Sequence, residues 1–304
     1  MTARAPLLSV VVCSYNRAGL LPGCLDSLVG QTLDPSLYEV IVVDNNSTDR
    51  TGEIAAGYAE LYPNFRVVTE PRQGLSNARN RGWRVACGSL VAYLDDDAKA
   101  TFSWCEGIVR AFQTVLPRPA AVGGEIRPWY SCAPPRWFSD ALEARTWGSH
   151  AHFLASSCAR YGFSGSNMAF PKEILVGFGG FSAELGMMGG TMALGEETEL
   201  FTRIYADHPH FWYDPAISVF HLVPPGNMRL GYRFRRSFKC GAAIAQIEGR
   251  PRGFRHCLRG AIDVGFVLAR AALALPRSGA GFGTEAVRRL EELGGRVGYF
   301  FGSI

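Results

Sequence analysis

The chain has 304 residues, of which 47% are hydrophobic and 19% are charged. This composition supplies a sizeable core and excludes a wholly disordered protein. The net charge of +4 is unevenly distributed, because residues 229–304 hold 14 Lys/Arg and 5 Asp/Glu, or +9, and residues 1–228 therefore carry −5. An acidic body is followed by a basic tail.

Two features bear on where the protein resides. The 8 cysteines form no C-x-x-C pair and no disulfide-framework spacing, which is typical of thiols in a reducing compartment. The first apolar stretch, residues 7–12, is too short for a signal peptide or a membrane span. We therefore predict a cytoplasmic protein.

The first hundred residues alternate between strand-like and helix-like patterns. A continuous β-branched run at 7–12 predicts a strand buried on both faces. The elements that follow are a helix at 20–29, a strand at 40–43, a helix at about 50–62, a strand at 65–69, a helix at about 75–87 and a strand at 90–94. This alternation predicts an α/β fold in which helices cover a parallel sheet.

Beyond residue 100 the pattern is less regular. We predict a helix at about 102–115, a strand at 120–126, an irregular insertion at 128–161, a Gly/Met-rich stretch at 177–195, a helix from Glu196, short strands at 211–213 and 217–221, and a helical tail from Met228. The insertion carries aromatic side chains that either stack on a ligand or pack against the sheet: Trp129, Tyr130, Trp137 and Trp147.

Polar residues follow the predicted strands at their carboxyl ends, where parallel sheets bind ligands. Asp95, Asp96 and Asp97 come directly after an apolar strand. Adjacent carboxylates repel one another, so such a cluster usually holds a cation, and Mg²⁺ or Mn²⁺ prefers oxygen ligands. The alternative is a solvated acidic turn. Asp44 follows residues 40–43 in the same way, and it either caps the next helix together with Asn45 or accepts a hydrogen bond from a nucleoside.

Five segments occur in an order that resembles a known family. They are Ser9–Arg17 (SVVVCSYNR), Val40–Thr51 (VIVVDNNSTDRT), Gly74–Gly82 (GLSNARNRG), Leu90–Asp97 (LVAYLDDD) and Gly195–Arg203 (GEETELFTR). Together they resemble the family 2 glycosyltransferases, over roughly residues 7–225. The resemblance implies the GT-A fold, a Rossmann-like αβα sandwich with a mostly parallel sheet. We predict a catalytic domain at 1–227, with a nucleotide-sugar-binding half at 1–100 and an acceptor half at 101–227, and a basic helical extension at 228–304.

The resemblance also implies roles for single residues on the donor side. The loop after the first strand would frame the nucleotide through Cys13, Ser14, Asn16 and Arg17. Asp44, beside Asn45, would hydrogen-bond the base, usually uracil, and Arg79 would lie near the base or the diphosphate. Asp95, with Asp96 beside it, would approach the ribose or the metal, and Asp97 would bind the Mn²⁺ or Mg²⁺ that bridges the diphosphate.

On the acceptor side, Glu197 stands where the family usually has the Asp of its Glu-Asp pair, the general base of inverting members. Glu and Asp have similar pKa values, so the substitution affects reach more than basicity. Glu196 or Glu199 is the alternative base, and an exposed acidic first helical turn is the structural alternative for all three. His221 follows an apolar strand and either supplies an imidazole to the metal, as in some GT-A enzymes, or is a hydrogen-bonded core residue.

The basic tail has two interpretations. Its Arg/Lys residues are interleaved with apolar ones, which suits an anionic membrane surface or a lipid-diphosphate acceptor. It equally suits a solvated helical face, whereas no nucleic-acid-binding module accompanies the charge. A peripheral location on the inner face of the membrane is therefore one prediction.

We predict an inverting, metal-dependent glycosyltransferase that moves a sugar from a nucleotide sugar, most simply UDP-linked, to a saccharide, lipid-linked or small-molecule acceptor. Two alternatives are a sugar-phosphate nucleotidyltransferase, which usually carries a Gly-rich basic loop that residues 13–17 lack, and a non-catalytic glycan- or lipid-binding subunit.

Overall fold

The computed structural model describes residues 5–159, 162–188, 194–249 and 282–301. The chain forms two compact units. Unit 1 comprises residues 1–127, 145–189 and 196–221, and unit 2 comprises residues 128–144, 190–195 and 222–304. Part of the predicted insertion thus groups with the C-terminal helices.

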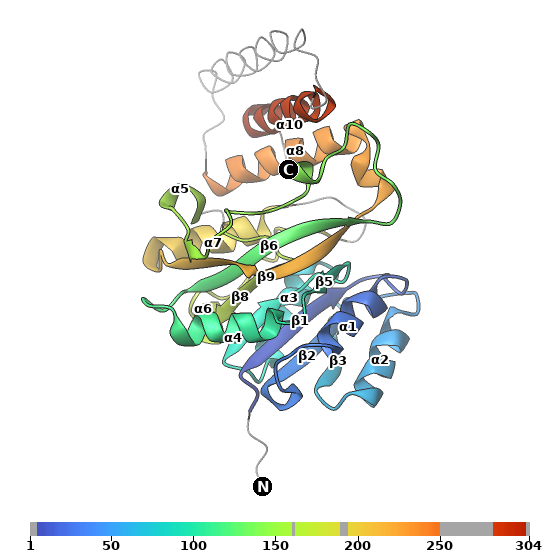
Figure 1. The fold of residues 1–304 in the computed structure, drawn as a ribbon, viewed down its shortest axis with the longest axis vertical. Coiled ribbons are helices and arrows are strands. Elements are labelled where there is room, and N and C mark those ends of the chain that lie inside the picture. The colour runs from blue at the N-terminus through green and yellow to red at the C-terminus, as the bar shows by residue number, and fades with distance from the viewer. Residues whose placement is uncertain (1–4, 160–161, 189–193, 250–281, 302–304) are drawn as a thin grey trace. The chain divides into compact units, whose positions relative to one another are not determined.

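The described elements are shown in Figure 1. The strands are β1 Leu8–Ser14, β2 Tyr38–Asp44, β3 Phe65–Thr69, β4 Leu90–Tyr93, β5 Ala98–Ala100, β6 Ala121–Tyr130, β7 His152–Phe153, β8 Met168–Pro171 and β9 Phe211–Val223. The α-helices are α1 Leu21–Val29, α2 Thr51–Leu61, α3 Leu75–Val85, α4 Trp104–Thr114, α5 Ser156–Ala159, α6 Lys172–Gly177, α7 Glu196–Asp207, α8 Leu230–Ile247 and α10 Phe282–Phe301.

The strands form one mixed sheet in the order β3-β2-β1-β4-β8-β6-β9-β5, with β7 paired to β9. The four strands β3, β2, β1 and β4 are parallel, as the alternating sequence pattern predicts. The other side of the sheet is antiparallel through β8, which lies between β4 and β6. The α/β fold with a mostly parallel half and flanking helices is confirmed.

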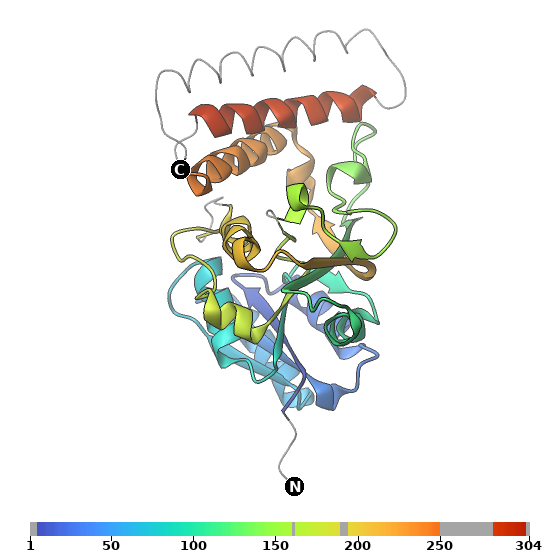
Figure 2. The same cartoon turned by 90° about the vertical axis from the view of Figure 1, so that its left-hand side faces the viewer.

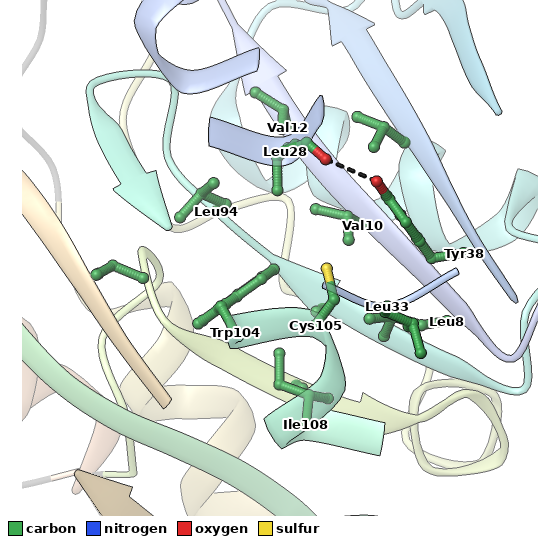
Figure 3. Packing of buried hydrophobic residues seen from close by; sticks show 14 of the residues in the cluster. Leu8, Val10, Val12, Leu28, Leu33, Tyr38, Leu94, Trp104, Cys105 and Ile108 are labelled. Atoms are coloured by element: carbon green, nitrogen blue, oxygen red, sulfur yellow. Dashed lines mark hydrogen bonds between the residues drawn. The ribbon is translucent and has the colours of Figure 1, made fainter. Parts of the chain in front are cut away.

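The sheet has a hydrophobic core on each face. One core contains Val10 and Val12 of β1 with residues of α1, α2 and α4, and Figure 3 shows its centre around Trp104, Cys105 and Ile108. The other contains Val11 of β1 with residues of α3, α6 and α7. Successive strand residues point to opposite faces, so a β-branched run such as β1 fills both cores at once.

Unit 2 contains the helices α8 and α10, which lie side by side in Figures 1 and 2. They approach closely through glycine, because a Cβ on Gly241 would lie 2.0 Å from the Gly295 carbonyl oxygen and one on Gly298 would lie 1.8 Å from that of Phe238. The Arg233 guanidinium is 1% exposed and contacts Glu143 and, at 2.5 Å, Glu291. Part of the tail's positive charge is therefore neutralised within unit 2.

Several details differ from the sequence-based expectations. Residues 211–223 form one strand rather than two short ones, and β5 and β8 were not predicted because three or four residues carry too little periodicity. Of the insertion's aromatics, Tyr130 and Trp137 pack on the small apolar cluster of unit 2. Breaks expected near 249–253 and 276–283, and the apolar run at 260–275, fall largely or wholly outside the described residues. No described helix is both long and apolar enough to cross a membrane.

Candidate active site

The site lies at the carboxyl ends of β1, β2 and β4, which are adjacent and parallel. The chain leaves β4 through Asp95, Asp96 and Asp97 and then forms β5, whose Ala98 pairs with His221 of β9. This antiparallel pairing brings His221 beside the three aspartates, although more than a hundred residues separate them in the sequence. A pattern of local hydrophobicity cannot reveal such a pairing.

Asp95, Asp97 and His221 form a group that could hold a metal ion. Each offers one ligand atom, and these atoms lie within 4.8 Å of one another. The Nε2 atom of His221 is 3.2 Å from Asp97 Oδ1 and 3.8 Å from Asp95 Oδ2. Burial raises the pKa of Asp97, whereas hydrogen bonds and charge from His221 and Arg79 outweigh the burial of Asp95 and hold its pKa below the usual value. The two carboxylates therefore have unlike environments.

The first turn of α7 brings two glutamates to the same site. Glu196 Oε1 is 3.0 Å from Arg79 Nη1, and Glu197 Oε1 is 3.3 Å from the same atom. The second Arg79 nitrogen, Nη2, is 3.5 Å from Asp95 Oδ1. Burial, and next the charge of Glu197, raise the pKa of Glu196. The Glu197 side chain is 22% exposed, whereas that of Glu196 is only 3% exposed.

Glu199 has a different environment. Its two carboxylate oxygens accept from Arg203 Nε at 2.5 Å and from Arg203 Nη2 at 2.8 Å. The same guanidinium donates to the carbonyl oxygens of Phe178 and Gly180. Glu199 thus anchors the segment that follows α6, whereas Glu196 and Glu197 contact Arg79.

Two predicted donor-binding residues hold loops together. Asn16 has a φ of 53°, and its Oδ1 accepts from the Thr48 backbone N–H at 2.7 Å, which joins the loops after β1 and β2. Asn45 is 4% exposed, donates from Nδ2 to the carbonyls of Glu70 and Arg72, and accepts at Oδ1 from the Gly74 N–H at 2.8 Å. Their amides shape the rim of the site.

Asp96 bonds to the loop after β1. Its Oδ2 accepts from Ser14 Oγ at 2.7 Å, and its Oδ1 is 3.8 Å from Arg17 Nε. Burial, and then the charge of Asp97, raise the pKa of Asp96 to about 7. Cys13 is partly buried, and burial raises the pKa of its thiol to about 12, so the thiol stays protonated at neutral pH.

Asp44 ends β2 and is partly exposed. Its Oδ1 accepts from the Ser47 N–H at 3.0 Å and so holds the turn after β2. The predicted alternative that Asp44 and Asn45 cap the next helix is wrong, because Arg50 stands at the N-cap of α2 and this helix has no side-chain capping hydrogen bond. The Oδ2 atom of Asp44 faces α2, because a Cβ on Gly52 would lie 3.0 Å from it. The nucleoside-binding role of Asp44 stays a prediction.

One residue of the site was missed by the sequence reasoning. The Gly165 backbone N–H donates to Glu197 Oε1 at 3.2 Å, and a Cβ at this position would lie 1.9 Å from Arg79 Nη2. Gly165 lies in the segment before β8 and contacts side chains from α3 and α7. The family resemblance of residues 165–170 gives a role to Asn167 and none to Gly165. The run of small residues, Gly165-Ser166, is the signal that another group approaches closely there.

Comparisons with known proteins identify the family and the fold. Residues 9–166, just over half of the chain, match the model of the family described as glycosyl transferase family 2. The chain is 39% identical over 107 residues to the glycosyltransferase AglE of Haloferax volcanii, with 35% of each chain covered. It is 27% identical to the glucosyl-dolichyl phosphate glucuronosyltransferase of the same organism, with 65% of this chain and 63% of that protein covered. The matches thus span less than two thirds of these relatives.

Among solved structures, the mannosyltransferase PcManGT of Pyrobaculum calidifontis, in complex with GDP-Man and Mn²⁺, is similar with a TM-score of 0.64 and 21% identity. The similarity covers 99% of this chain and 89% of that one. At this identity it shows the fold alone, which is the predicted GT-A fold. With the fold and the family model in agreement, the chain belongs to glycosyl transferase family 2.

Proposed function

We propose that the protein is an inverting glycosyltransferase that moves a sugar from a nucleoside-diphosphate sugar to an acceptor hydroxyl. The observation that carries the proposal is the grouping of Asp95, Asp97 and His221, joined through Arg79 to the glutamates of α7. A metal-holding group and a candidate base thereby face one site, as a single displacement requires.

The donor set fits Mn²⁺ or Mg²⁺. Two carboxylates and one imidazole leave positions for diphosphate oxygens, and these oxygen-rich ligands are those that hard divalent ions prefer. When bound, the ion acts as a Lewis acid that stabilises the negative charge of the departing diphosphate. Asp95, Asp97 and His221 would hold it.

Glu197 is the proposed general base. It is the more exposed of the two glutamates at the site, and a carboxylate there can take the proton from an attacking hydroxyl. Attack from the face opposite the leaving diphosphate inverts the anomeric centre. The buried Glu196 has no such access and serves as a partner of Arg79.

On the donor side, we propose that Asp44 accepts from the nucleobase and that the loop from Cys13 to Arg17 frames the nucleotide. UDP is the predicted nucleotide, and GDP is the alternative because PcManGT was solved with GDP-Man. The acceptor is proposed to be a saccharide, a lipid-linked sugar or a small molecule. A dolichyl-linked sugar is the favoured acceptor, because the relative that is 27% identical is a glucosyl-dolichyl phosphate glucuronosyltransferase.

The proposal is tested by incubating the protein with UDP- and GDP-sugars, with Mn²⁺, with Mg²⁺ or with EDTA, and measuring nucleoside diphosphate release. We expect release from at least one donor only with a metal, and loss of at least 100-fold in Glu197→Gln, within the range for removal of a general base. Pyrophosphate release from NTP and sugar phosphate would instead show a nucleotidyltransferase. Nucleotide binding without turnover on any acceptor would show a non-catalytic subunit.

A further inference from the structure

Arg79 is a buried cation at the junction of two parts of the site. It lies on α3 with 2% of its surface exposed, and its guanidinium contacts Asp95 after β4 and both Glu196 and Glu197 on α7. One planar group therefore touches both the metal-holding loop and the candidate base. A guanidinium fixes direction as well as charge, because its N–H donors form a rigid fork.

The space around this fork is closed on the side of Gly165. A Cβ at this position would lie 1.9 Å from Arg79 Nη2 and 2.4 Å from Glu197 Oε1, closer than any real contact. The Gly165 N–H also donates to Glu197 Oε1 at 3.2 Å. Glu197 is thus held from two directions, by the guanidinium and by a backbone amide.

The charges around Arg79 also indicate an internal role. Three carboxylates surround one cation, and the ring of Phe181 lies 5.4 Å from the guanidinium carbon. Both terminal nitrogens, Nη1 and Nη2, thus lie against protein carboxylates, and only 2% of the residue is exposed, which leaves little of the side chain for a substrate.

We propose that Arg79 and Gly165 are positioning residues that hold the Glu197 carboxylate at a fixed place relative to Asp95, and so relative to the donor. This inference rests on the proposed function and assigns Arg79 a role different from the direct donor contact implied by the family resemblance. Arg79 acts through Glu197 rather than on the substrate. Misplacing a reacting group by about 1 Å can cost on the order of 100-fold in rate.

The test uses Gly165→Ala, which adds one methyl group and removes no charge or hydrogen-bonding group. The matched control is Gly57→Ala on α2, where a Cβ would meet nothing within 4 Å. For each protein we would measure the melting temperature, kcat and KM for the donor, and, by calorimetry, the Kd of UDP and GDP with Mn²⁺. We expect kcat of Gly165→Ala to fall by about 100-fold, with nucleotide affinity within threefold of wild type, as for the control.

Arg79→Lys is the second variant and keeps the inference testable if Gly165→Ala does not fold. Lysine retains the positive charge but lacks the planar set of guanidinium N–H donors that contacts Glu197 and Asp95 together. We therefore expect kcat to fall while nucleotide affinity is retained. Wild-type kcat in a folded Gly165→Ala would overturn the inference, and so would an Arg79→Lys defect confined to nucleotide affinity, since Arg79 would then contact the donor. Absence of donor turnover in the wild type would refute the proposed function, and this inference with it.

Discussion

Asn167 provides a sharp test of how the second half of unit 1 is held together. Its side chain is 1% exposed, its Oδ1 accepts from the Trp104 indole N–H at 2.9 Å, and its Nδ2 donates to the carbonyls of Ile217 at 2.9 Å and Glu125 at 3.2 Å. One amide thereby links α4, β6 and β9 to the segment before β8. Residues 165–170 also resemble the segment that lies beneath the donor sugar in family 2 glycosyltransferases, and this resemblance makes Asn167 a candidate for lining the acceptor crevice.

Replacing Asn167 by Ala leaves these three partners without their bonds. A buried group left unsatisfied costs about 1–3 kcal/mol, and the two carbonyls can recover part of this through their second lone pairs. We therefore expect a loss of about 3 kcal/mol in the free energy of unfolding. This corresponds to a fall in Tm of about 6–12 °C for a unit of this size.

The assay is thermal unfolding followed by circular dichroism. Asn167→Asp is the informative companion, because it places a carboxylate oxygen against two carbonyl oxygens and should be at least as destabilising. Gln113→Ala, at an exposed position of α4, is the control and should lie within about 0.5 kcal/mol of wild type. An Asn167→Ala protein with unchanged Tm but lost transfer would refute the structural role and restore the acceptor-crevice role.

Two further predictions concern the first half of unit 1. Burial raises the pKa of Glu39, but hydrogen bonds from Arg66 and Ser9 outweigh it and the net pKa lies below the usual value. Its contribution to stability is therefore present above about pH 4.3, the unfolded value, and is lost as pH falls through the folded pKa. Glu39→Gln should therefore lower Tm at pH 7, and the difference in Tm between this variant and the wild type should become smaller as the pH is lowered. A difference in Tm that stays constant with pH would contradict this prediction. Gly82→Ala would place a Cβ 2.3 Å from Val11 Cγ1 and should cost about 1–3 kcal/mol in urea unfolding, and an unchanged midpoint would show that α3 can move off β1.

Much of the parallel half of the fold could be predicted from the sequence. The strands at 7–12 and 40–43 are buried on both faces, so their sequences are continuous apolar runs. Such runs predict strands even when the neighbouring strands are unknown. The aspartates after β4 were marked as candidate ligands for the same reason, since the end of a buried strand is a fixed place in an α/β sheet. Both signals, an apolar run and the polar residues that directly follow it, lie within a few neighbouring residues and can therefore be recognised in a single sequence.

The rest depends on long-range pairing. His221 meets Asp97 only because β5 pairs with β9, and Arg79 meets Glu197 across more than a hundred residues. Gly165 has no side chain to mark its contact with Glu197. The sequence alone leaves Glu196, Glu197 and Glu199 as alternative bases. The structure shows their contacts: Glu197 lies beside Arg79, and Glu199 pairs with Arg203.

We propose that the carboxylates after β4 hold the metal that supports nucleotide-sugar binding and turnover. The decisive experiment titrates wild type and Asp97→Asn with the nucleotide of the preferred donor, with and without Mn²⁺, and measures donor turnover on the same samples. We predict that Mn²⁺ strengthens nucleotide binding to the wild type at least tenfold, and that Asp97→Asn loses both this dependence and turnover while its Tm stays near wild type. A folded Asp97→Asn protein that keeps Mn²⁺-dependent binding and turnover would show that Asp97 does not hold the metal.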